Sequence, residues 1–97
     1  MESVAILGAT GSIGKSSLDV ISRYPDRFTV YAVTANSSVK KLAQAAKDSG
    51  AKVAVIADKE LLGALQDELK AAGSRAQALA GAKAIDEIAS SPEVDIV

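Results

Sequence analysis

The chain has 97 residues, of which 48% are hydrophobic and 24% are charged, and its formal net charge is −1. This length allows one domain at most, and the composition is that of a globular protein. A net charge near zero excludes the basic footprint of a nucleic-acid-binding domain, so we expect no nucleic-acid partner. Cysteine and histidine are both absent, which excludes disulfides and thiolate chemistry and removes the commonest general base and metal ligand.

We also expect no membrane partner, because no apolar run approaches the roughly 20 residues that a membrane-spanning helix needs. A strand is expected almost directly after Met1, which leaves no room for a signal or transit peptide. The expected location is therefore the cytoplasm.

The first stretch with a chemical signature is VAILGATGSIG at residues 4–14. Its first four residues suit a strand that is covered on both faces, as in a parallel sheet. Gly8, Gly11 and Gly14 can provide a sharp turn, close backbone approach to a phosphate, and close packing of a helix on the strand. A helix that begins here directs its free N–H groups and positive dipole end at the same place. The stretch predicts a dinucleotide pyrophosphate site, with a strand-to-helix turn without ligand as the alternative.

The helix that follows is expected over residues 12–23, with Gly14, Leu18 and Ile21 on the stripe that faces the sheet. Pro25 stops it. A second strand is expected over residues 28–34, followed by a polar turn in which Ser37 or Ser38 can cap a helix over residues 39–49. The inner stripe of that helix should contain Val39, Leu42, Ala45 and Ala46, and Gly50 should form its C-terminal cap.

The remaining elements continue the alternation. A strand is expected over residues 51–57, then a helix over residues 59–72 that Asp58 caps and Gly73 ends, then a short strand over residues 75–79. A short helix that holds Ile85 and Ile88 precedes a last strand over residues 94–97. Aromatic residues make up only 3% of the chain, so the core must be built from Ala, Val, Ile and Leu.

Strands that alternate with helices imply right-handed crossovers and a parallel sheet. We therefore predict an α/β fold, Rossmann-like, with three layers and a mainly parallel sheet. Because the chain stops inside an apparent buried strand, we expect the fold to be incomplete at the C-terminus.

The end of the second strand selects between the two nicotinamide cofactors in this type of fold. An Asp or Glu about 20 residues after the glycine turn binds the ribose 2′-hydroxyl of NAD. The corresponding loop contains no acidic residue and consists of Thr34, Ala35, Asn36, Ser37 and Ser38. A carboxylate would repel a 2′-phosphate, whereas hydroxyl and amide donors at a helix N-terminus could receive one, and Lys40 and Lys41 could add charge. The loop favours NADPH over NADH, and a plain helix cap is the alternative.

The chain resembles the N-terminus of the 1-deoxy-D-xylulose 5-phosphate reductoisomerase family. The resemblance rests on ILGATGSIG at residues 6–14, followed by SLDVI at residues 17–21. It continues through residues 28–30, 32–33, 35–39 and 73–75 to Gly81, and so covers essentially the whole chain. Other NADP enzymes share the short GATGxxG pattern, but the extension GSIGxSxLDV is much more specific.

This resemblance implies an enzyme that rearranges 1-deoxy-D-xylulose 5-phosphate and reduces the intermediate with NADPH to 2-C-methyl-D-erythritol 4-phosphate, in the non-mevalonate route to isoprenoids. It implies a divalent metal (Mg²⁺, Mn²⁺ or Co²⁺), a phosphosugar substrate, a homodimer and a bacterial cytoplasmic location for the full-length protein. Within this chain, the positions that match family contacts to the pyrophosphate and ribose are Thr10, Gly11, Ser12 and Ile13. The loop around the 2′-phosphate matches Asn36, Ser37 and Ser38. These residues and Gly8 of the turn are the expected cofactor contacts.

One departure from the family falls in that loop, because many members carry a basic residue where this chain has Ser37. Lys40 or Lys41 could compensate. The family's metal-binding and catalytic residues lie beyond this chain, so we expect no catalytic and no metal-binding residue here, and an inactive polypeptide if residues 1–97 are isolated. The acidic residues that could suggest a metal are expected to be surface charges or helix caps: Asp19, Asp58, Glu60 and Asp86.

Two alternatives stay open at this point. Another NADP-dependent reductase, of the semialdehyde dehydrogenase type, would share the glycine turn but would need a catalytic cysteine outside this chain. A stand-alone nucleotide-binding regulatory module would be complete at 97 residues. Under the main hypothesis, residues 1–97 form part of an NADPH-binding domain, and the catalytic, metal-binding and C-terminal domains are absent from the chain.

Overall fold

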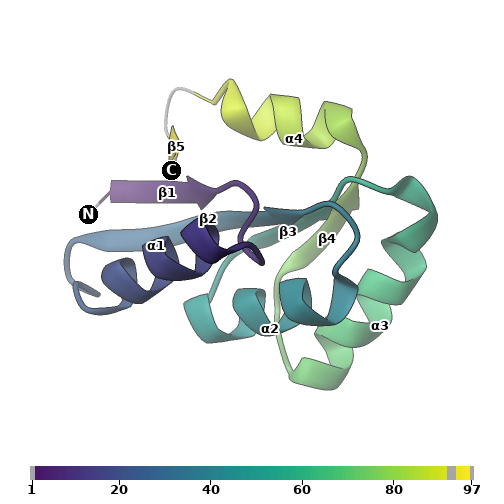
Figure 1. Ribbon diagram of the computed structural model, residues 1–97, viewed down its shortest axis with the longest axis horizontal. Coiled ribbons are helices and arrows are strands. Elements are labelled where there is room, and N and C mark those ends of the chain that lie inside the picture. Colours follow the sequence, from purple (N-terminus) through teal and green to yellow (C-terminus); the bar gives the residue numbers. More distant parts are fainter. Residues whose placement is uncertain (1, 92–93, 97) are drawn as a thin grey trace.

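A computed structural model of the chain describes residues 2–91 and 94–96 (Figure 1). Strands and helices alternate along these residues. In chain order they are β1 (Glu2–Ile6), α1 (Ser12–Ser22), β2 (Phe28–Ala35), α2 (Val39–Ser49), β3 (Val53–Ile56), the 3₁₀ turn η1 (Lys59–Leu61), α3 (Leu62–Ala72), β4 (Gln77–Ala80), α4 (Ala82–Ala89) and β5 (Asp95–Ile96).

All the strands of the described residues pair in parallel, in the order β4-β3-β2-β1-β5. The first four strands step across the sheet in one direction, and β5 then returns to the free side of β1. Right-handed crossovers therefore place α1, α2 and α3 on one face and α4 on the other (Figure 1). The prediction of a three-layer, Rossmann-like α/β fold is confirmed. In such a sheet, ligands bind at the carboxyl ends of the strands beside the point where the strand order reverses, which is here the end of β1.

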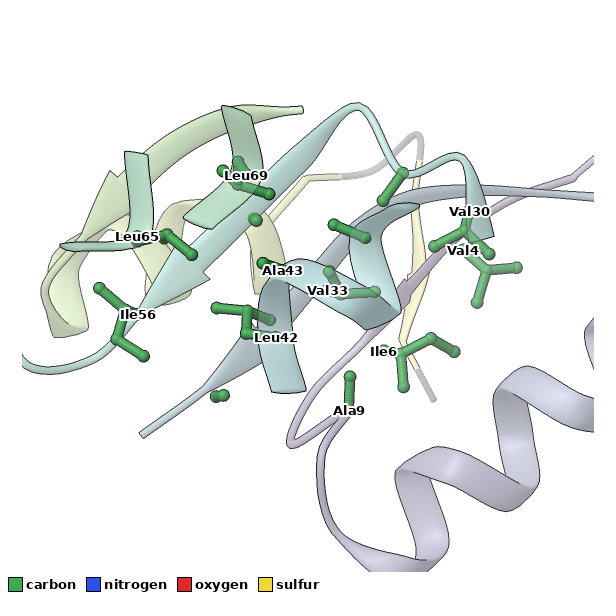
Figure 2. Packing of buried hydrophobic residues seen from close by; sticks show 14 residues of the cluster. Val4, Ile6, Ala9, Val30, Val33, Leu42, Ala43, Ile56, Leu65 and Leu69 are labelled. Carbon is green, nitrogen blue, oxygen red and sulfur yellow. The ribbon is translucent and has the colours of Figure 1, made fainter. Parts of the chain in front are cut away.

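Small aliphatic residues fill the space on both faces of the sheet, as the scarcity of aromatic residues predicts. The larger cluster lies between the sheet and the helices α2 and α3 (Figure 2) and includes Val4, Ile6, Val33, Leu42, Ile56, Leu65 and Leu69. The smaller cluster lies under α4 and consists of Ala5, Ala32, Val53, Val55 and Ile88. Each face of the sheet thus carries an apolar cluster, which is why the strands read as continuous apolar runs.

The pairing of β1 with β2 shifts in register between Val4 and Ala5. Val4 lies opposite Val30 and Ala5 lies opposite Ala32, so one extra residue of β2 is accommodated there. The shift explains why Val30 and Val33 belong to the same core cluster although they are three residues apart. Every later residue of β2 consequently lies on the face opposite to the one that strict alternation predicts.

Glycines end two of the helices as predicted. Gly50 follows α2 and Gly73 follows α3, both in the left-handed conformation, with φ of 68° and 77°. The stretch expected to begin the third helix instead forms η1, and α3 begins at Leu62. Leu42 and Ala46 are buried in α2 as expected, and Ala43 is buried as well.

The predicted caps have different outcomes. Asp58 caps η1, since its carboxylate accepts a hydrogen bond from the Glu60 N–H at 3.0 Å. Ser38 occupies the N-cap position of α2 as predicted, but its hydroxyl makes no capping hydrogen bond. The difference follows from the backbone. Asp58 is extended, with ψ of 108°, whereas Ser38 has ψ of 76°, outside the extended conformation from which a cap side chain reaches the first helical N–H groups.

Candidate functional site

Both polar backbone groups of Gly8 are used to hold the turn after β1. Its N–H donates to Oγ1 of Thr34 at 3.0 Å, and its carbonyl oxygen accepts from the Gly11 N–H at 3.0 Å. The next residue, Ala9, donates its N–H to the carbonyl oxygen of Thr34 at 2.8 Å. Gly8 has φ of 67°, in the left-handed region that favours glycine. The sharp turn predicted at Gly8 is confirmed, and the turn is anchored to the end of β2.

Gly14 permits the close packing that the glycine pattern predicts. A Cβ atom at this position would lie 2.2 Å from the carbonyl oxygen of Gly8 and 2.6 Å from Cα of Ala9. The first turn of α1 therefore rests on the backbone of the turn. The situation at Gly11 is different, since its backbone suits any residue and a Cβ would lie an ordinary 3.5 Å from the Gly8 carbonyl oxygen. The protein itself does not require glycine at position 11.

The N-terminus of α1 opens onto the carboxyl edge of the sheet. Gly11 is the N-cap and makes no side-chain capping bond, so the first N–H groups of the helix are left for another acceptor. Gly11 and Ser12 are exposed, Thr10 is half-buried, and Ile13 contributes helical backbone. A helix N-terminus preceded by a tight glycine turn is a typical binding site for phosphate groups.

The second predicted group of residues lies at the same edge, one strand away. Asn36, Ser37 and Ser38 follow β2 and are all exposed. The carbonyl oxygen of Asn36 accepts from the Asp58 N–H at 3.2 Å, which joins this loop to the one after β3. The structure therefore brings the glycine turn and the polar loop together, with Thr34 connected to both.

A groove of about 470 Å³ runs between α1 and α2 and begins at Thr10. Lys15 and Lys41 line it, whereas Lys40 does not. Asp19 and Asp48 also line it, and each already has a side-chain partner. Asp19 forms an ion pair with Arg23 at 2.9 Å, and Asp48 accepts from Gln44 at 2.8 Å. Of the two lysines that follow the polar loop, Lys41 is thus the one that lines this groove.

Acidic side chains do not assemble into a metal site in the part of the chain that the structure describes. Asp19, Asp58, Glu60 and Asp86 are all exposed, with Asp19 ion-paired and Asp58 acting as a cap. Their predicted roles as surface charges or caps agree with these positions. No helix of the described residues is long and apolar enough to cross a membrane.

The sequence model of the 1-deoxy-D-xylulose 5-phosphate reductoisomerase family matches residues 4–97. The chain belongs to this family. It is 46% identical over 96 residues to the 1-deoxy-D-xylulose 5-phosphate reductoisomerase of Cellvibrio japonicus, covering 99% of this chain and 24% of the relative. It is 56% identical over 86 residues to the enzyme of Zymomonas mobilis, covering 89% of this chain and 22% of the relative. The chain therefore spans about a quarter of the length of these relatives.

Solved reductoisomerase structures have the same fold as this chain. The Zymomonas mobilis enzyme in complex with NADPH superposes with a TM-score of 0.81 at 55% identity, over 89% of this chain and 22% of that one. A DOX-P reductoisomerase in complex with NADPH, fosmidomycin and magnesium superposes with a TM-score of 0.88 at 35% identity, over 99% of this chain and 24% of that one. The resemblance found in the sequence is confirmed.

The sequence did not predict the role of Thr34, the residue of β2 that anchors the glycine turn. Its position suggested only a non-acidic member of the polar loop. It is 3% exposed, and it is the one buried polar side chain found among the described residues. A signal was available, since a hydroxyl in an otherwise apolar buried strand must find a hydrogen-bond partner. Which hydrogen-bond partner the Thr34 hydroxyl finds depends on how β1 and β2 pair.

Proposed function

We propose that this chain is the NADPH-binding part of a 1-deoxy-D-xylulose 5-phosphate reductoisomerase. The observation that carries the proposal is the N-terminus of α1, which a glycine turn presents at the carboxyl edge of the sheet in a chain of this family. A structure of a relative that is 55% identical is described as a complex with NADPH. In this proposal, residues 1–97 are part of the cofactor domain.

The cofactor contacts fall into two groups. Gly8, Thr10, Gly11, Ser12 and Ile13 bind the pyrophosphate and the adjoining ribose through the turn and the first N–H groups of α1. The adenosine 2′-phosphate is bound by Asn36, Ser37 and Ser38, at the N-terminus of α2. Residues 34–38 contain no carboxylate that would repel the 2′-phosphate, and Lys41 supplies positive charge from the groove between α1 and α2.

When bound, NADPH supplies the hydride for the reduction of the rearranged phosphosugar. The residues of this chain bind and orient the cofactor. The whole protein isomerises and reduces 1-deoxy-D-xylulose 5-phosphate to 2-C-methyl-D-erythritol 4-phosphate as a homodimer in the bacterial cytoplasm. A divalent metal (Mg²⁺, Mn²⁺ or Co²⁺) is held by residues outside positions 1–97, and structures of relatives are described as complexes with magnesium.

The test is a pair of calorimetric titrations of the full gene product with NADPH and NADH. We expect NADPH to bind more tightly. Ser37→Arg should tighten NADPH by about tenfold or more, because it adds a charge-assisted hydrogen bond to the 2′-phosphate, and should leave NADH unchanged. Ser90→Arg is the matched control, since Ser90 is equally exposed but follows α4 at the opposite edge of the sheet. Equal affinity of the unaltered protein for NADPH and NADH would refute the 2′-phosphate site.

A second variant tests the pyrophosphate end. Gly11→Val places a side chain where the protein leaves space, so the fold should persist, but the side chain should block the approach of a phosphate to the helix N-terminus. We expect an unchanged melting temperature and a loss of NADPH binding. Retained binding would place the pyrophosphate elsewhere.

A further inference from the structure

We propose that Thr34 is a positioning residue that couples the two halves of the cofactor site. It holds the glycine turn in place through Gly8 and at the same time leads into the polar loop at Asn36. This inference rests on the proposed function, because it concerns how the same site binds NADPH.

The first step of the argument is the pair of hydrogen bonds that Thr34 makes to the turn. Its side-chain oxygen accepts from the Gly8 N–H at 3.0 Å, and its main-chain oxygen accepts from the Ala9 N–H at 2.8 Å. Thr34 itself is only 3% exposed, whereas Gly8 is exposed, so this bond is partly buried and water can compete for it only from the Gly8 side. One residue thus fixes two consecutive N–H groups of a turn that has left the strand ladder.

The second step is the dependence of α1 on Gly8. The Gly8 carbonyl oxygen accepts from the Gly11 N–H, and it lies directly against Gly14. A displacement of Gly8 therefore displaces both the N-cap and the first turn of α1. The orientation of the N–H groups proposed to bind pyrophosphate therefore depends on a short series of contacts that begins at the Thr34 hydroxyl.

The third step is the position of Thr34 in the sheet. It pairs with Val55 of β3, and the following residue, Ala35, pairs with Ile56. Asn36 comes next and begins the loop proposed to bind the 2′-phosphate. Thr34 is therefore held by the central sheet on one side and stands between the two phosphate sites, so that their spacing is set at this residue.

The test compares two substitutions that separate the hydrogen bond from the packing. Thr34→Val keeps the branched shape but removes the acceptor, which leaves the Gly8 N–H without its protein partner. Thr34→Ser keeps the hydroxyl but removes the methyl group. We expect Thr34→Val to weaken NADPH binding by up to about tenfold, because the partly buried bond that holds the Gly8 N–H is lost. We expect Thr34→Ser to bind NADPH nearly as the unaltered protein does, at a lower melting temperature.

Two controls show whether the loss of affinity in Thr34→Val arises at the pyrophosphate end of the site and is independent of protein stability. Adenosine 2′-monophosphate carries the 2′-phosphate but no pyrophosphate, so its affinity should be unchanged in Thr34→Val. Ile56→Val creates a small cavity in the larger core cluster, where Ile56 pairs with Ala35, and should lower the melting temperature without changing the affinity for NADPH. All titrations use the full gene product. The positioning role is overturned if Thr34→Val and Thr34→Ser bind NADPH equally well, or if Thr34→Val weakens both ligands to the same extent.

Hydrogen exchange separates this inference from the proposed function. Amide exchange across residues 4–14, followed by mass spectrometry without ligand, should be faster in Thr34→Val than in Thr34→Ser. Equal exchange in the two variants would overturn the role of Thr34 even if NADPH binds. Failure of the unaltered protein to bind NADPH would refute the proposed function, and the exchange comparison would still decide whether Thr34 positions the turn.

Discussion

Helices α1 and α2 have 11 residues each and lie on the same face of the sheet, but they are held in different ways. The body of α2 buries Leu42, Ala43 and Ala46 in the larger core cluster. In α1, the apolar residues Leu18 and Ile21 are only partly buried against that cluster. The buried side chains labelled in Figure 2 come from the sheet, from the turn after β1 and from α2 and α3, while α1 lies to one side.

The surroundings of α1 are correspondingly open. The groove of about 470 Å³ separates it from α2, and a second, apolar groove of about 490 Å³ lies between α1 and the sheet, lined in part by Val4 and Phe28. Val20 and Tyr24, at the end of the helix, are 52% and 48% exposed. These two large apolar side chains therefore lie largely in solvent.

The comparison shows that different parts of the two helices hold them to the rest of the protein. The body of α2 contributes to the hydrophobic core, whereas α1 is fixed mainly at its first turn, by Gly14 against Gly8 and by the bonds of Gly8 to Thr34. A helix that presents its N–H groups to a phosphate needs an accurately placed first turn, and the rest of it can pack loosely. The sequence of α1 fits this division, because four of its residues are serines.

The largest expected effect separates the bodies of the two helices. Leu42→Ala should lower the free energy of unfolding by about 3 kcal/mol, because it opens a cavity in a fully buried site. Leu18→Ala should cost only about 1 kcal/mol, because that side chain is already half in solvent. Urea unfolding of the full gene product measures both, with the exposed Lys40→Ala as a control. Equal losses of unfolding free energy in Leu18→Ala and Leu42→Ala would contradict the conclusion that only the body of α2 contributes strongly to the core.

A second comparison sets two helical glycines against each other. Gly14→Ala should destabilise the protein by about 2 kcal/mol, because the new Cβ meets the backbone of the turn. Gly63→Ala in α3 should stabilise it by about 0.5–1 kcal/mol, because nothing lies within 4 Å of the new atom and the helix loses a flexible residue. Thermal unfolding followed by circular dichroism gives both values. If Gly14→Ala proved neutral, the first turn of α1 would not be its attachment point.

The smallest effect is expected for the ion pair on α1. Arg23 and Asp19 lie 2.9 Å apart, but their side chains are 68% and 64% exposed. Arg23→Ala should therefore cost at most about 0.5 kcal/mol, and the difference should disappear in high salt. A cost well above 1 kcal/mol that persists in high salt would mean that the body of α1 is held by its charges.

Much of the local structure could be predicted because it depends on near neighbours in the chain. The strand before Gly8, the helix stops at Gly50 and Gly73 and the cap at Asp58 follow from residue types within a few positions. Ser38 takes the N-cap position, but a serine in the sequence does not reveal the backbone angle, here ψ of 76°, at which its hydroxyl makes no capping bond. The cofactor contacts remain a prediction, although the structure places the glycine turn and the polar loop at the same edge.

The sequence by itself determined the alternation of elements, the glycine turn, the absence of a carboxylate after the second strand and the family. Those features are written in residue types and their spacing. Only the tertiary structure decided the register shift between β1 and β2, the burial of Thr34, its bond to Gly8 and the loose packing of α1. The physical reason is distance along the chain. Thr34 and Gly8 are 26 residues apart, and no local pattern specifies which hydroxyl meets which N–H group once two strands have paired.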